Sequence, residues 1–184
     1  MRRLSLLLLA LGLGLGAPGC RSTPKGPDVD GLLARLKSED ATVSGAANLE
    51  VIRLGEPAVP GLVAMLQSGD VRLRKVAATT LWGLGPKGRG AVPDLAAMLE
   101  APETELRLAA AMALDNMGPA AVDAVPALVK ALRDPEGQVR QWSAKALGHI
   151  GPGAAAAVPA LSRAAKSDPV RPTMEEAIRQ IRGQ

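Results

Sequence analysis

The stretch Gly118–Pro126, GPAAVDAVP, decides the fold of this chain because it recurs along the sequence. Gly85–Pro93 reads GPKGRGAVP, Gly151–Pro159 reads GPGAAAAVP, and Gly55–Pro60 is a shortened copy, GEPAVP. The prolines that close the four copies follow one another at intervals of 33 residues: Pro60, Pro93, Pro126 and Pro159. A fixed period of this length is typical of proteins built from stacked helical repeats.

The composition is that of a globular protein whose core contains almost no aromatic residues. Of 184 residues, 47% are hydrophobic and 22% are charged, and the chain has no Phe, no Tyr and two Trp. The core must then consist of Ala, Leu, Val, Ile and Met, which suits closely packed helices. The net charge of +4 falls to +2 without Arg2 and Arg3, because 20 basic residues then face 18 acidic ones. We therefore expect no nucleic-acid partner.

Residues 1–19 have the three-part layout of a secretory signal. Arg2 and Arg3 precede an uncharged run, LSLLLLALGLGL, at 4–15, and small residues follow at 16–19. The 12 residues of this run are too few to cross a bilayer, which takes about 20. The pattern therefore predicts a signal peptide over 1–19.

The apolar run is followed at its end by Cys20, the single cysteine of the protein. The stretch Ala17-Pro18-Gly19-Cys20 resembles the lipobox of bacterial lipoproteins, although that family favours Leu where Ala17 stands and Pro18 is uncommon in it. The resemblance implies that Cys20 is the mature N-terminus and carries acyl chains. The protein would then be exported and lipid-anchored to a bacterial membrane, facing the periplasm or the cell surface. A plain signal cleaved nearby, which leaves a free thiol, is the alternative.

Aligned on the prolines, the remaining chain divides into a tether and five units. The tether is 20–30, the units are 31–60, 61–93, 94–126 and 127–159, and a degenerate, polar cap is 160–184. Each unit opens with a short apolar helix, such as LVAMLQS from Leu62, and continues through a turn into a second helix. The second helices are expected to stop at Gly55, Gly85, Gly118 and Gly151.

The second helices share one apolar stripe, which predicts how the units stack. Its aligned rows are Val43, Leu73, Leu106, Val139; Ala47, Ala77, Ala110, Ser143; Val51, Leu81, Leu114, Leu147; and Leu54, Leu84, Met117, Ile150. Spacings of 4, 4 and 3 residues place the rows on one face of a helix. One helix pair cannot bury this face alone, so each unit needs its neighbours.

The segments 68–85, SGDVRLRKVAATTLWGLG, and 134–151, DPEGQVRQWSAKALGHIG, resemble HEAT repeats. They are similar in particular to the bacterial form known as phycobilisome-lyase HEAT-like repeats, and the resemblance covers about residues 31–170. It implies an all-α, right-handed α-solenoid of about five helix pairs. It also implies a concave face that is lined by the second helices and holds another protein.

An acidic residue followed four residues later by Arg recurs in the family and at three turns of this sequence. The pairs are Asp70 with Arg74, Glu103 with Arg107, and Glu136 with Arg140, whereas unit one has Asp40 with Ser44. One interpretation is a polyanion site. We favour a structural ladder in which the arginines bond turn carboxylates and carbonyls, because each Arg has its own acid at one-turn spacing.

The sequence offers little chemistry. It has one histidine, His149, and no Gly-rich phosphate loop. Asp115 and Asn116 stand alone on a helix, and the paired His-Glu motifs of iron-carrying HEAT-type enzymes are lacking. We expect no enzyme activity, no metal, no cofactor and no small-molecule substrate.

The second helices carry, opposite the apolar stripe, residues that differ from unit to unit. Both tryptophans lie there, and Trp is a favoured anchor at protein interfaces. The expected partner-binding residues are Trp82, Met112, Asp115, Trp142, Lys145 and His149. The alternative, that both tryptophans fold back as the edge of the core, stays open.

These observations predict a non-enzymatic, membrane-tethered scaffold or adaptor of the bacterial cell envelope, with a protein partner on its concave face. A HEAT-like lyase or chromophore-handling protein is an alternative that rests on the family resemblance. A nucleic-acid-binding solenoid is another, because unit 61–93 has five basic residues against one acidic residue, while unit 94–126 has one against six.

Overall fold

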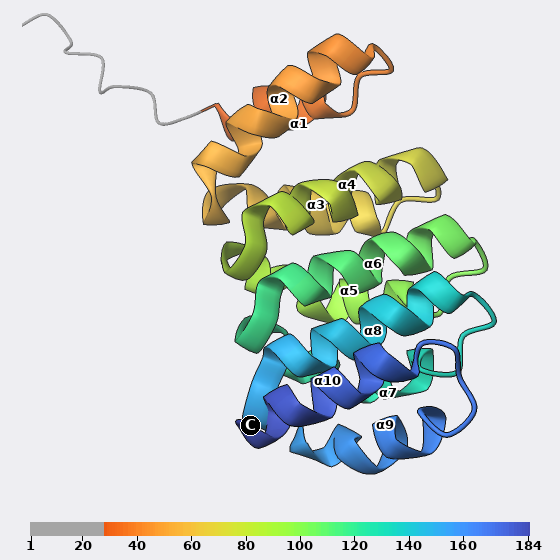
Figure 1. The fold of residues 1–184 in the computed structure, drawn as a ribbon. Coiled ribbons are helices and arrows are strands. Elements are labelled where there is room, and N and C mark those ends of the chain that lie inside the picture. Colours follow the sequence, from red (N-terminus) through yellow and green to blue (C-terminus); the bar gives the residue numbers. More distant parts are fainter. Residues whose placement is uncertain (1–27) are drawn as a thin grey trace, which may run out of the picture.

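The computed structural model describes residues 28–184, which form five helical hairpins stacked in chain order (Figure 1). The hairpins pair α1 (Val29–Leu36) with α2 (Ala41–Leu54), α3 (Val59–Leu66) with α4 (Val71–Leu84), α5 (Val92–Met98) with α6 (Thr104–Met117), α7 (Val125–Ala131) with α8 (Gly137–Ile150), and α9 (Val158–Ala164) with α10 (Arg171–Arg182). Short 3-10 helices join them: η1 (Glu56–Ala58), η2 (Gly85–Ala91), η3 (Gly118–Ala124) and η4 (Gly151–Ala157). The predicted all-α solenoid is confirmed, and the described part of the chain contains no strand.

The ten helices lie in two layers, with the second helix of each hairpin in one layer and the first helices behind it (Figure 1). From α4 to α10, adjacent second helices pack along one another, whereas adjacent first helices barely touch. The second helices approach closely because both of their flanks bear small buried residues: Ala78, Ala111 and Ala144 on one, and Thr80, Ala113 and Ala146 on the other. The more closely spaced layer is the inner, concave side of the stack.

The ends of the second helices follow the local signals of the sequence. Asp40 and Asp70 cap α2 and α4, and the backbone N–H groups of Thr42 and Arg72 donate to their carboxylates at 2.8 Å. The glycines that stop the helices take positive φ angles, 78° at Gly55, 54° at Gly85, 53° at Gly118 and 71° at Gly151. A residue with a Cβ is strained in this conformation, which explains glycine at each stop.

The prolines of the repeated stretch start helices. Pro60, Pro93, Pro126 and Pro159 each lie in the first turn of a first helix, where a missing N–H costs nothing. The first proline of the motif, such as Pro86, lies at the start of the 3-10 helix that precedes the first helix. Unit one lacks three residues here, and its 3-10 helix η1 has three residues where η2 has seven.

Two sequence expectations at the start of the stack are wrong. Helix α1 begins at Val29, with Asp28 as its cap, so the last two residues of the predicted tether 20–30 belong to the fold. Val43 was expected in the buried stripe, yet its side chain is 37% exposed, whereas Leu106 and Val139 of the same row are fully buried. The reason is position, because no described helix pair precedes α1 and α2 to cover Val43.

The last unit ends the stack with an amphipathic helix. Pro172 lies in the first turn of α10 and does not interrupt it. Met174, Ala177 and Ile181 of α10 are buried, while Glu175, Glu176 and Arg179 are exposed. The helices of residues 28–184 include none that is both long and apolar enough to cross a membrane. The predicted signal and Cys20 lie outside the described residues.

Candidate protein-binding site

Trp142 and Lys145 form the centre of the candidate site on α8. They lie one helical turn apart, and Lys145 Nζ is 4.3 Å from the centroid of the Trp142 ring. This is the distance of a cation–π contact, which holds both side chains in place on the helix surface. The indole is half-buried and packs against the core, so Trp142 combines anchorage with an exposed edge.

Asp115 on α6 and His149 on α8 join the two central second helices. Asp115 Oδ1 lies 2.8 Å from His149 Nδ1, a distance within ion-pair range, although the two groups are not aligned as a hydrogen bond. The Asp115 side chain is 9% exposed and that of His149 is 50% exposed. Burial raises the pKa of Asp115, and the nearby His149 and Lys145 partly oppose that rise. We name Asp115, Trp142, Lys145 and His149 the α6–α8 cluster.

Met112 and Trp82 are the other two predicted residues. Met112 is half-buried on α6, one turn before Asp115. Trp82 lies on α4 and is 45% exposed, and its backbone carbonyl accepts a hydrogen bond of 2.7 Å from the side chain of Asn116. Of the two interpretations of the tryptophans, an exposed position fits Trp82, whereas Trp142 is both core edge and surface.

Helix α10 contributes residues that the sequence did not assign to the site. A hollow of about 320 Å³ between α8 and α10 is lined by Lys145, His149, Thr173, Glu176 and Gln180, together with Pro172 and Ala177. The sequence feature that could have revealed this contact is Gly148, because a Cβ there would approach Ala177 Cα to 3.1 Å and would also meet the Gln180 side chain. Only a residue without a side chain lets α10 pack this closely on α8.

The arginines of the turns form a ladder, but not with the acids that the sequence suggested. Arg107 binds Asp134 of the next unit through Nε at 2.7 Å and Nη2 at 3.1 Å, and its Nη1 donates to two carbonyls of its own turn. Arg140 binds Asp168 in the same way at 2.5 Å. Their expected partners, Glu103 and Glu136, form no ion pair with them.

This ladder is buried and directional. The Arg107 and Asp134 side chains are 11% and 6% exposed, and the hydrogen bonds to Asp134 raise the pKa of Arg107 further above its ordinary value. Arg74 has no such partner, because Ala101 stands where the next turns have an aspartate, and its Nε is buried without a hydrogen bond. Asp70 serves as a helix cap and forms no ion pair with Arg74.

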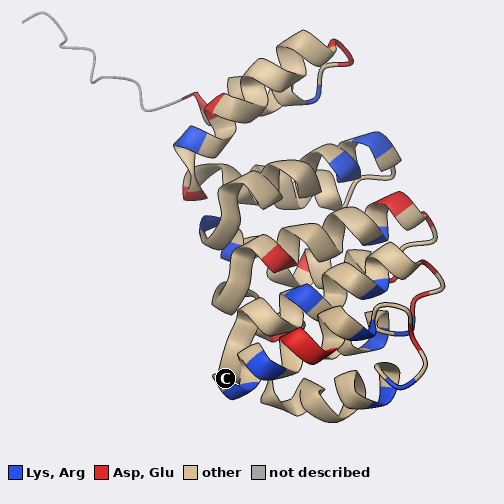
Figure 2. Cartoon of the chain, in the orientation of Figure 1, with Lys and Arg blue, Asp and Glu red and all other residues tan. Residues whose placement is uncertain are grey.

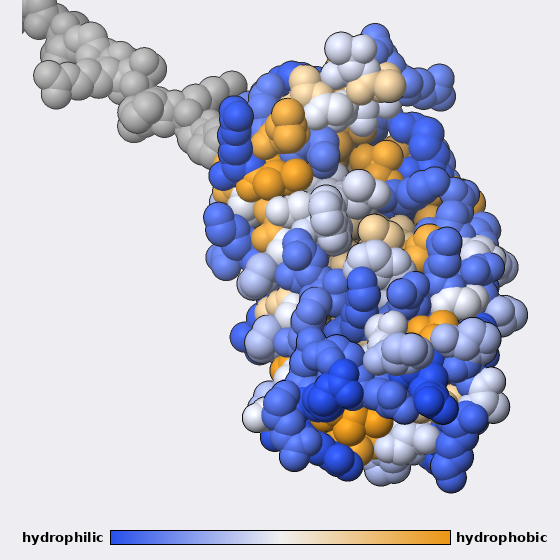
Figure 3. Space-filling model, viewed as in Figure 1, coloured by the Kyte–Doolittle hydropathy of each residue, from blue (hydrophilic) through white to orange (hydrophobic). Residues whose placement is uncertain are grey.

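Charged and apolar side chains occupy different parts of the surface over the second helices. Charged residues gather along the edge formed by the turns between first and second helices (Figure 2). In the same view, apolar side chains reach the surface mainly over the first two units, whereas the face over α6, α8 and α10 is mostly hydrophilic (Figure 3). Leu49 and Val43 of α2 are among the exposed apolar residues. Over the described range, no three His, Cys, Asp or Glu residues are grouped as a metal site would require.

Two family models match the chain. The model described as HEAT repeats matches residues 92–182, and the model described as armadillo/beta-catenin-like repeat matches residues 50–84. No curated protein matches the sequence.

Solved structures share the fold. The complex of CpcE and CpcF of phycocyanin lyase from Nostoc matches with 28% identity over 91% of this chain and 71% of the matched chain, with a TM-score of 0.66. An engineered protein from a structural genomics consortium matches with 26% identity over 84% of this chain and 79% of its own, with a TM-score of 0.63. A designed armadillo repeat protein in complex with the peptide (KR)4 is 17% identical over 83% of this chain and 81% of its own, with a TM-score of 0.64. At this identity the match shows the fold alone.

Proposed function

We propose that this chain, a HEAT-repeat protein, is a scaffold that holds a protein partner on its second-helix surface and performs no chemistry of its own. The observation that carries the proposal is the α6–α8 cluster. It combines an aromatic anchor at Trp142 with a stacked cation at Lys145 and a cross-helix pair, Asp115 and His149. Tryptophan is among the residues that are enriched at interface hot spots.

The arrangement of the cluster suits a partner that lies across the helices. Its residues come from α6 and α8, and the hollow beside it extends to Glu176 and Gln180 of α10. The half-buried indole is held by the core and by Lys145, so little conformational entropy is lost when a partner covers it. The similarity to a chain from the CpcE–CpcF complex, which contains two proteins, supports partner binding as the role of the repeats.

Membrane tethering is the second part of the proposal and rests on the sequence alone. Cys20 follows a signal-like apolar run and lies eight residues before Asp28, the first residue that the structure describes. Acyl chains on Cys20 would hold the solenoid at a membrane surface. Intact-mass analysis of membrane-extracted protein tests this part, and a mature chain without acyl groups, or one that starts at another residue, contradicts it.

The binding surface is tested with variants of the cluster and a matched control. Affinity capture from detergent-solubilised envelope, followed by mass spectrometry, supplies a candidate partner, and its dissociation constant is then measured by calorimetry. Trp142→Ala and Lys145→Ala alter the cluster. Val122→Ala alters an exposed apolar residue on η3, outside the second-helix layer.

The expected result is selective loss of affinity. Truncation of a hot-spot tryptophan costs about 2 kcal/mol or more, roughly a thirtyfold rise in dissociation constant. Val122→Ala should leave the constant unchanged, and circular dichroism establishes the folded fraction of each variant. Equal affinity for all variants, after correction for the folded fraction, contradicts the proposed surface.

A chromophore-handling role is the second candidate, and the similarity to a phycocyanin lyase chain favours it. A lyase of this kind binds its chromophore, so the discriminating measurement is the absorbance spectrum of a bilin mixed with the purified chain. A saturable spectral change favours this candidate over the scaffold. An unchanged spectrum removes it.

A further inference from the structure

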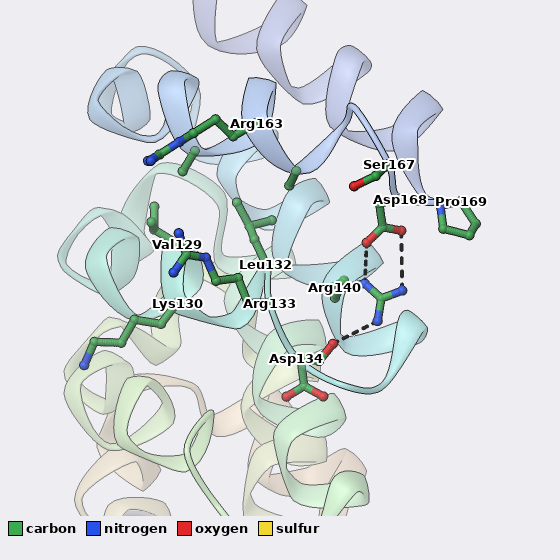
Figure 4. A pocket seen from close by; sticks show the side chains of 12 residues that line it. Val129, Lys130, Leu132, Arg133, Asp134, Arg140, Arg163, Ser167, Asp168 and Pro169 are labelled. Atoms are coloured by element: carbon green, nitrogen blue, oxygen red, sulfur yellow. Dashed lines mark hydrogen bonds and ion pairs between the residues drawn. The ribbon is translucent and has the colours of Figure 1, made fainter.

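A hollow of about 680 Å³ lies in the first-helix layer, between α7 and α9 and the turns that follow them (Figure 4). Its volume is within the range of about 300–1,000 Å³ that is typical of small-molecule sites. The wall is apolar where α7 and α9 face each other, at Val129, Leu132, Ala160 and Ala164. This hollow is separate from the α6–α8 cluster and has no part in the proposed function.

Four basic side chains line the hollow, Lys130, Arg133, Arg140 and Arg163, and two of them have no counter-charge among the described residues. Arg133 follows α7 and Arg163 lies on α9, and neither forms an ion pair with a described residue. Among residues 28–184, the Arg163 side chain makes one hydrogen bond, from Nε to the Pro159 carbonyl, and none through its two terminal nitrogens. Lys130 is paired with Glu100 at 3.0 Å on the exposed surface. Figure 4 shows Arg133 and Arg163 extending toward the same side of the hollow.

The two carboxylates in the lining do not cancel these charges, because both are bound by other arginines. Asp134 accepts from Arg107 at 2.7 Å, and its side chain is 6% exposed. Asp168 accepts from Arg140 and from the Val170 N–H. Burial alone would raise the pKa of Asp168, but these hydrogen bonds and the Arg140 charge outweigh it, so the pKa lies below its ordinary value. The Arg140–Asp168 pair lies across the hollow from Arg133 and Arg163 (Figure 4).

We propose that this hollow is a binding site for a small phosphate monoester with a compact apolar group. The charge balance carries the choice of ligand, because Arg133 and Arg163 leave two positive charges unmatched. A phosphate monoester carries about −1.5 to −2 charges at pH 7, with several acceptor oxygens. Guanidinium groups match its geometry with paired N–H donors. The apolar wall then contacts the organic part of the ligand.

The first test measures binding of phenyl phosphate to the full chain by calorimetry, with phenyl sulfate, a monoanion of similar shape, as the comparison ligand. Arg133→Gln and Arg163→Gln each remove one charge from the hollow. Arg53→Gln, an exposed arginine on α2, is the matched control. Each hollow variant is expected to weaken phenyl phosphate binding about tenfold or more, because hydrogen bonds between charged groups are the strong ones. Arg53→Gln should bind as the unaltered chain does.

The headgroup of phosphatidic acid is also a phosphate monoester. A second experiment therefore distinguishes this lipid from a soluble ligand. Vesicle flotation compares phosphatidylcholine alone with phosphatidylcholine containing phosphatidic acid. The full chain carries Cys20→Ser, so that acylation does not contribute. Flotation that depends on phosphatidic acid and is lost in Arg133→Gln and Arg163→Gln identifies a lipid headgroup, whereas binding of phenyl phosphate without such flotation identifies a soluble ligand.

Three results overturn the proposal. The first is no saturable binding of either phosphate source. The second is binding that both hollow variants retain at the affinity of Arg53→Gln. The third is phenyl sulfate binding as tightly as phenyl phosphate, because the match of two charges is then irrelevant. None of these results bears on the Trp142 surface, so the two proposals fail independently.

Discussion

Replacement of Arg140 by Met removes the last rung of the turn ladder and nearly keeps the volume of the side chain. Arg140 holds Asp168 through Nε at 2.5 Å, and its Nη1 donates to the carbonyls of Asp134 and Pro135 at 2.8 and 3.1 Å. In Arg140→Met the Asp168 carboxylate keeps only the Val170 N–H as a donor. A charge that is mostly withdrawn from water is then left without its counter-ion.

The expected loss of folding stability follows from the burial of the Arg140–Asp168 pair. The Arg140 and Asp168 side chains are 18% and 13% exposed, well below the exposure of a surface ion pair. Removal of one partner from a buried pair costs about 3–5 kcal/mol, and the partial exposure of this pair favours the lower end, about 3 kcal/mol. For a protein of this size the melting temperature should fall by roughly 6–12 °C.

The assay is thermal unfolding followed by circular dichroism, with Arg74→Met as the matched control. Arg74 occupies the same position two units earlier, but the next turn offers Ala101 where an aspartate would be, and its Nε has no partner. Arg74→Met should therefore lower the free energy of unfolding by less than about 1 kcal/mol. Equal destabilisation by the two variants would refute the view that the next-turn aspartate gives the ladder its strength.

The difference between wild type and Arg140→Met should also depend on pH. The Asp168 pKa is lowered in the folded state from its ordinary value of 3.8. The stability that the pair contributes is then fully present above pH 3.8 and is lost as the pH falls through the lowered pKa. The two melting temperatures should converge in acid, and a gap that does not narrow there contradicts the assignment.

Three other predictions use the same melts. Burial raises the pKa of Asp115 above 3.8, so the stability linked to this carboxyl is present below that pH and is lost as the pH rises through the raised pKa. The melting temperature of Asp115→Asn should therefore rise relative to that of wild type between pH 3.5 and pH 7. An unchanged difference between the two melting temperatures contradicts this prediction. Trp142→Ala should melt at a lower temperature than Trp82→Ala, because only the Trp142 indole packs against the core, and the reverse order would refute the burial argument. Deletion of 94–126 should leave a cooperatively folded stack more stable than deletion of 94–110, because whole units keep the register and bring Arg74 to Asp134.

The fold was predictable because its signals are local and repeated. Gly-Pro pairs mark the ends of α4, α6 and α8, and Asp40 and Asp70 mark two helix starts, so the hairpins could be placed without any tertiary information. The resemblance to HEAT repeats then supplied the arrangement of the hairpins, and the family models match both halves of the stack.

The site was less predictable because its contacts join different units. An alignment of repeats shows that Arg107 and an acid recur together, but it does not show that the partner is Asp134, 27 residues further on. The role of α10 beside Lys145 and His149 was hidden for a related reason, since its sequence departs from the repeat and was assigned to a cap. The exposure of Val43 depends on what precedes unit one, which a repeat pattern cannot express.

The next-turn ladder also gives the stack a direction. A contact in which one unit holds its successor is head-to-tail, because the two surfaces that meet are different. The arginine of each rung stands six residues after the preceding aspartate position, as in Asp134 and Arg140. Six residues after Asp168 stands Met174, which lies on α10 and is fully buried. The final unit accepts a bond from its predecessor, and a buried methionine occupies the position from which an arginine would hold a further unit.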